Sequence, residues 1–98
     1  MKLKWTPTAR KTYFSVLDYL YENWTEKEMR SFVDKVEHVL ISIKENPFLF
    51  ESSVKMKNIR KCTITPQNKL FYRVKPRKKE IHLIMFWDNR RNPIKLKY

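Results

Sequence analysis

Two apolar segments separated by a basic turn dominate the last third of the chain. Residues 70–74 (LFYRV) and 81–87 (IHLIMFW) flank the basic residues 75–79 (KPRKK). This pattern is typical of an antiparallel hairpin. The second strand carries apolar residues on both faces, so we expect it near the centre of a sheet. Strict alternation places Ile81, Leu83, Met85 and Trp87 on the face that packs against helices, and Ile84 and Phe86 with His82 on the other.

A first helix is predicted over residues 7–23. Pro7 suits the first helical position, because the N–H that proline lacks would be unpaired there, and Thr6 is the expected cap. The apolar positions that follow the three-and-four spacing of one helical face are Phe14, Leu17, Leu20, Tyr21 and Trp24.

A second helix is predicted to follow almost at once. Thr25 and Glu28 have the spacing of a capping box, and Asn46-Pro47 stops the helix near residue 45. Its predicted buried face comprises Met29, Phe32, Val33, Val36, Leu40 and Ile43. The two helices therefore form an antiparallel hairpin whose apolar side needs a cover.

Strands are predicted both before and after this helical hairpin in the sequence. Residues 2–5 suit a short edge strand, and residues 59–65 form a longer one in which Arg60 faces the buried side or a rim. We expect the aromatic connector 47–57 to be pinned to the helices by Phe48, Leu49 and Phe50, and Asn68 to adopt a positive φ in the turn after residue 65. The fold class is α+β, β-α-α-β-β-β, as one domain over residues 1–98 with a mainly antiparallel sheet.

The charge is concentrated in the second half of the chain. Of 22 Lys and Arg and 10 Asp and Glu, residues 1–50 hold 8 basic and 7 acidic side chains, and residues 51–98 hold 14 and 3. A field this lopsided attracts nucleic acids or acidic proteins. Its alternative role is to keep the protein soluble. A single cysteine and no long apolar run favour a cytoplasmic protein without a membrane partner.

Familiar catalytic motifs are absent from the sequence. There is no glycine for a phosphate loop, no HExxH and no paired-cysteine spacing, so we expect no metal, cofactor or small-molecule substrate. Cys62 is expected in the core and His38 on the surface. For His82, a structural role and an acid–base role are both open.

Arginines and lysines remain as the candidate functional groups. Arginine pairs bidentately with phosphate and can stabilise the charge that develops when a ribose 2′-hydroxyl cleaves RNA. Each of these side chains has the alternative of pairing with a carboxylate. The candidates for contacting a target or nucleic acid are Arg60, Arg73, Lys75, Arg90, Arg91 and Lys95.

Taken in order, several segments resemble the RelE/ParE superfamily of toxins from bacterial type II toxin–antitoxin pairs. The segments are residues 5–9 opening the first helix, Asn46-Pro47 after the second, Ile59-Arg60, the strands 70–74 and 81–87, and residues 90–93 (RRNP). The resemblance implies the same fold, a role in growth inhibition or plasmid stabilisation, and a cognate antitoxin with an acidic segment.

The resemblance implies two possible mechanisms. RelE-like members are ribosome-dependent mRNA endonucleases, for which Arg60, Arg90 and Tyr98 would be the catalytic set here. ParE-like members bind and poison DNA gyrase without being enzymes, and the FYRV and DNRRNP segments are closer to theirs. Ile64 stands where such nucleases tend to carry a second arginine, which favours the gyrase mechanism. The remaining alternative is a basic nucleic-acid-binding domain that is not a toxin.

Overall fold

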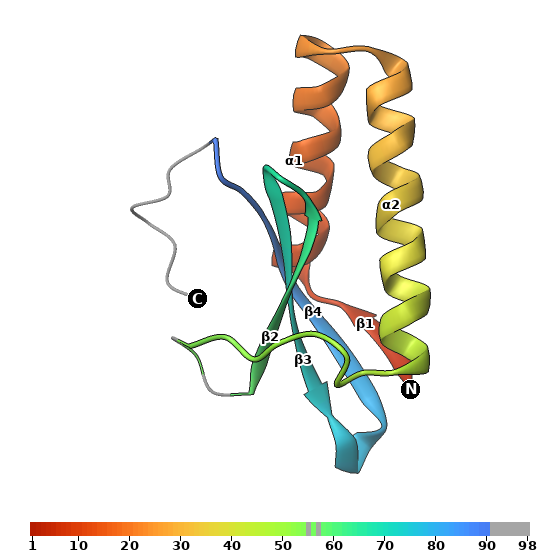
Figure 1. Cartoon of the computed structure of the whole chain (residues 1–98), viewed down its shortest axis with the longest axis vertical. Helices are drawn as coiled ribbons and strands as arrows, with labels where there is room; N and C mark the ends of the chain where they lie inside the picture. Colours follow the sequence, from red (N-terminus) through yellow and green to blue (C-terminus); the bar gives the residue numbers. More distant parts are fainter. Residues whose placement is uncertain (55, 57, 91–98) are drawn as a thin grey trace.

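The predicted order of elements is confirmed. The structure is a computed structural model that describes residues 1–54, 56 and 58–90 (Figure 1). Its elements are β1 Lys2–Trp5, α1 Pro7–Asn23, α2 Glu26–Glu45, β2 Ile59–Thr65, β3 Asn68–Lys75, the 3₁₀ turn η1 Pro76–Lys78, and β4 Glu80–Asp88. No helix in this part of the chain is long and apolar enough to cross a membrane.

Threonine caps start both helices. The Thr6 hydroxyl accepts from the Ala9 N–H at 3.1 Å and donates to the Leu83 carbonyl at 2.7 Å, so it also attaches α1 to β4. The Thr25 hydroxyl accepts from the Glu28 N–H at 3.2 Å. That is one half of the predicted capping box; the return bond from the Glu28 carboxylate is not formed among the residues that the structure describes.

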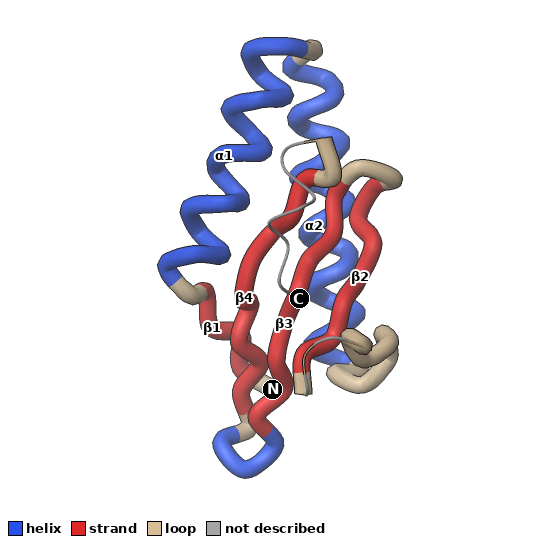
Figure 2. The backbone as a smooth tube through the Cα atoms, turned by 90° about the vertical axis from the view of Figure 1, so that its left-hand side faces the viewer, coloured by secondary structure: helices blue, strands red, loops and turns tan. Residues whose placement is uncertain are grey.

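The four strands form one sheet in the order β1-β4-β3-β2. β4 is a central strand as predicted, with β1 parallel on one side and β3 antiparallel on the other. Both helices lie on one face of this sheet (Figures 1 and 2). The core between the layers includes Leu70 and Tyr72 from β3 and Phe32, Val36 and Ile43 from α2. Met29 and Leu40 pack against it, so the predicted face of the second helix is confirmed except for Val33, in place of which Val39 packs against the core.

The predicted faces of β4 are wrong beyond Leu83. Tyr72 is paired with Leu83 but the preceding Phe71 is paired with Met85, so Ile84 is an extra residue on β4. This bulge reverses the alternation. Ile81, Leu83 and Phe86 are therefore buried in the core beneath the helices, whereas Met85 and Trp87 are half-buried outside it.

The predicted buried face of α1 is only partly right. Leu20 is buried and Leu17 packs against the core, but Phe14, Tyr21 and Trp24 are each more than half exposed. Ala9 and Val16 are buried in their place. A hydrogen bond from the Phe86 N–H to the Thr12 hydroxyl at 2.9 Å explains this difference, because it turns the side of α1 that carries Thr12 toward β4.

Two smaller predictions for the loops are also corrected. Phe48 and Leu49 are more than half exposed, and only Phe50 packs against the core, because polar contacts to the Pro47 and Phe50 carbonyls hold the connector. Asn68 does not have a positive φ; the described residues that do are Asn58 at 67° and Lys79 at 54°. The amide of Asn68 instead donates to the Thr65 hydroxyl at 3.1 Å.

Candidate target-binding surfaces

The sheet face opposite the helices carries many of the basic side chains. Residues paired across neighbouring strands lie on the same face. One row consists of Lys4, His82, Arg73 and Ile59, and further rows pair Lys75 with Glu80, Lys61 with Phe71, and Lys69 with Trp87. Two predicted candidates, Arg73 and Lys75, are therefore on the face opposite the helices, along β3, where both are half-buried.

His82 on this face has a structural partner. Its Nε2 lies 3.1 Å from Glu80 Oε1, and Lys4 Nζ lies 3.6 Å from the other carboxylate oxygen. The hydrogen bond from His82, with the nearby Lys4, lowers the pKa of Glu80. Of the two roles left open for His82, this contact favours the structural one.

Arg90, the expected phosphate clamp, is already paired. Its Nε and Nη2 donate to the two carboxylate oxygens of Asp88, each at 2.9 Å, and its backbone N–H donates to the same group. The guanidinium also lies 4.6 Å from the centre of the Tyr19 ring on α1. The hydrogen bond to Asp88 raises the pKa of Arg90. Asp88 is almost fully buried, and a buried carboxylate needs a cationic partner. The charge of Arg90, which the sequence suggested was available to a ligand, is therefore neutralised within the fold.

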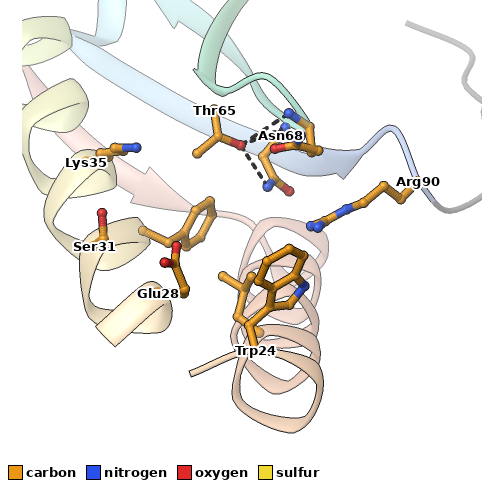
Figure 3. A pocket seen from close by; sticks show the side chains of 10 residues that line it. Trp24, Glu28, Ser31, Lys35, Thr65, Asn68 and Arg90 are labelled. Carbon is orange, nitrogen blue, oxygen red and sulfur yellow. Dashed lines mark hydrogen bonds between the residues drawn. The ribbon is translucent and has the colours of Figure 1, made fainter. Parts of the chain in front are cut away.

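A small cavity of about 130 Å³ lies beside Arg90, between the helical hairpin and the end of the sheet (Figure 3). Its lining includes Trp24, Glu28, Lys35, Thr65 and Asn68. Asn68 is 2% exposed, and its Oδ1 has no hydrogen-bond partner among the described residues. The cavity has about the volume of a few water molecules, so water suffices to satisfy this oxygen.

Arg60 lies on the helix-facing side of β2, at its rim, as predicted. It is half-buried, its Nη1 donates to the Phe50 carbonyl at 2.7 Å, and its guanidinium lies 5.0 Å from the centre of the Phe48 ring. These contacts hold the connector in place. Arg60 therefore has a structural function whatever else it binds.

The predicted site residues do not form one constellation. Arg60 is paired with Tyr72 on β3, whereas Asp88, the partner of Arg90, is paired with Asn68 at the start of that strand. Arg73 lies on the opposite face of the sheet from Arg60. Arg91, Lys95 and Tyr98 lie outside the described residues. The residues that β3 does bring together are Arg73 and Lys75, with Arg77 and Lys78 from η1 beside them. The sequence indicated Lys75 as a candidate and residues 75–79 as a basic turn, but it did not single out Arg77 and Lys78 as binding residues.

No group of three or more metal-binding side chains occurs in residues 1–54, 56 and 58–90. Cys62 is buried, and burial raises its pKa to about 11, so its thiol is not a nucleophile at neutral pH. The chemistry that these surfaces offer is therefore mainly the binding of anionic groups by lysine and arginine side chains.

Comparison with known proteins agrees with this arrangement. Residues 3–93 match the family described as "ParE toxin of type II toxin-antitoxin system, parDE". No curated protein matches the chain.

Three solved structures share the fold. The YoeB/ParE toxin from Agrobacterium tumefaciens is 20% identical, with a TM-score of 0.68 over 90% of this chain and 98% of that one. The chromosomal ParDE system of P. aeruginosa is 18% identical, with a TM-score of 0.65 over 90% of this chain and 95% of that one. The E. coli RelE toxin is 15% identical, with a TM-score of 0.64 over 95% of this chain and 88% of that one. At these identities the structures establish the fold, and the match over residues 3–93 establishes the family: the chain belongs to the ParE toxins of type II toxin–antitoxin systems.

Proposed function

We propose that this toxin arrests growth from the cytoplasm by binding and poisoning DNA gyrase, without catalysing RNA cleavage. The observation that carries the proposal is the state of Arg90, whose guanidinium is held by both oxygens of Asp88. A nuclease needs that group free to stabilise charge that develops in the transition state.

The other candidate groups support the same reading. Arg60 is engaged by a backbone carbonyl and an aromatic ring, and His82 by Glu80. A general acid or base must lie within reach of a substrate proton, and these contacts direct Arg60 and His82 to groups of the protein itself. Binding to a macromolecule makes weaker demands, because cations such as Arg73 and Lys75 act through their charge and placement.

A cognate antitoxin is the second part of the proposal. We infer that it carries an acidic segment that contacts the basic half of the chain. The ParE family is defined as one component of a toxin–antitoxin system, and the P. aeruginosa relative is described as part of a ParDE system. Steering between opposite charges should make association fast and sensitive to salt, because ions screen such fields over about 8–10 Å.

The test measures two activities of one purified preparation that also arrests growth when expressed. We expect inhibition of gyrase supercoiling and no ribosome-dependent mRNA cleavage. Replacing Arg73 and Lys75 by Gln should weaken gyrase inhibition. Replacing Lys27 and Arg30, which lie on the exposed side of α2, is the matched control for the loss of two charges. Cleavage of ribosome-bound mRNA without any effect on gyrase would replace this mechanism with the RelE-like one.

A further inference from the structure

The end of the β3–β4 hairpin forms a cationic cleft. A cavity of about 460 Å³ is lined by residues 73–78 of β3 and η1, which are Arg73, Val74, Lys75, Pro76, Arg77 and Lys78, and by Asn58. A second cavity of about 430 Å³, which includes Arg60, shares Asn58, Val74 and Pro76 with it. We call the first cavity the hairpin cleft. Figure 1 shows that this hairpin projects at the end of the molecule away from the turn between α1 and α2.

The charge in the hairpin cleft is not neutralised. Four of its lining side chains are cationic, and no carboxylate lines it. None of the four takes part in an ion pair among the residues that the structure describes. The nearest carboxylate in register, Glu80 opposite Lys75, is bound to Lys4 and His82. This contrasts with Arg90, whose charge is cancelled by Asp88.

The backbone around the hairpin cleft adopts an unfavourable conformation. The two described residues with positive φ are Asn58, which lines the cleft, and Lys79, which ends its turn. A positive φ is inexpensive for glycine and less so for lysine, so a lysine at this position keeps a charge at the expense of local stability. Hydrogen bonds from the Lys79 N–H to the Pro76 carbonyl at 3.1 Å and from the Lys2 N–H to the Lys79 carbonyl at 3.0 Å hold the turn rigidly.

We propose that the hairpin cleft binds the phosphodiester backbone of nucleic acid. Arginine forks match phosphate oxygens, and lysines contribute point charges. Among the lining residues the four cationic side chains outnumber the two apolar residues, Val74 and Pro76, which favours a ligand with regularly repeated negative charge. Contacts of this kind fix position without reading sequence. This activity goes beyond the proposed action on gyrase, because it requires neither gyrase nor the ribosome.

The test is direct binding of the purified toxin to labelled duplex DNA and, separately, to single-stranded RNA of equal length, measured by fluorescence anisotropy over a series of salt concentrations. We expect sequence-independent binding with a dissociation constant of roughly 10⁻⁶ to 10⁻⁴ M at physiological salt. The logarithm of affinity should fall linearly with that of salt concentration. The double variant Arg77→Gln/Lys78→Gln should reduce that slope by about two for DNA, close to one for each lost contact.

The control double variant is Lys27→Gln/Arg30→Gln, which removes the same charge from the opposite end of the molecule. It should keep the wild-type slope. Lys79→Gly is a third variant, which removes a charge next to the cleft. It should fold normally, because glycine tolerates the turn, and it should lower the slope by less than the double variant does. Weaker binding of DNA or of RNA by the cleft variants, with no change in the control variant, supports the proposal. The polymer whose binding is weakened shows whether the ligand is DNA or RNA. Equal losses in the control, or no binding of either polymer by the wild type, would overturn it.

Discussion

Replacing Arg90 by alanine should destabilise this toxin before it affects anything else. The substitution removes two charge-assisted hydrogen bonds, each of 2.9 Å, from a carboxylate whose side chain is 2% exposed. It also removes the cation that lies over the Tyr19 ring. What remains is a buried Asp88 that accepts from one backbone N–H.

The size of this effect follows from the burial of the two partners. Breaking a fully buried pair by removing one partner costs about 3–5 kcal/mol. The Arg90 side chain is 29% exposed, so water screens part of the interaction, and we expect a loss of about 2 kcal/mol in the free energy of unfolding. Arg90→Lys keeps the charge but not the fork and should cost about 1 kcal/mol.

Urea unfolding followed by circular dichroism measures these losses. Arg30→Ala is the matched control, because Arg30 makes a 2.8 Å pair with Glu26 whose side chains are 75% and 62% exposed, and such pairs contribute about 0.3–0.5 kcal/mol. Combining Arg90→Gln with Asp88→Asn should restore part of the stability lost in Arg90→Gln. A loss of stability for Arg90→Ala no larger than for Arg30→Ala would refute the assignment of Arg90 to the fold.

Three further measurements test the packing. Phe86→Ala should cost about 3–5 kcal/mol and Trp87→Ala distinctly less, because the bulge places only the former in the core; the opposite order in urea melts would restore strict alternation. Thr6→Ala should cost about 1–2 kcal/mol, more than Thr25→Ala, because Thr6 both caps α1 and bonds to β4, and equal thermal unfolding of the two variants would contradict this. The pKa of Cys62, near 11, lies well above its ordinary value, so at pH 8 the thiol is protonated and should react with Ellman's reagent only on unfolding; fast reaction of the native protein would show that the thiol is not buried.

Local signals in the sequence determined the elements of this protein. Thr6 with Pro7, Thr25 with Glu28, and Asn46 with Pro47 specify where the helices begin and end, since caps and stops depend on residues a few positions apart. The period of the apolar residues then distinguishes strand from helix. The order of elements, and with it the family resemblance, follows from these signals alone.

Only the tertiary structure decided which side chains face each other. The bulge at Ile84 depends on how β3 and β4 pair, and it turns Phe86 and Asp88 toward the helices. Arg90, two residues later, thereby pairs with a buried carboxylate beside Tyr19 of α1. An alternating pattern cannot reveal one extra residue in a strand, because both registers bury apolar side chains in a run as hydrophobic as this one. The structure also showed that Arg73, Lys75, Arg77 and Lys78, at the basic hairpin end, form no ion pair among the described residues, which depends on where the carboxylates lie in space.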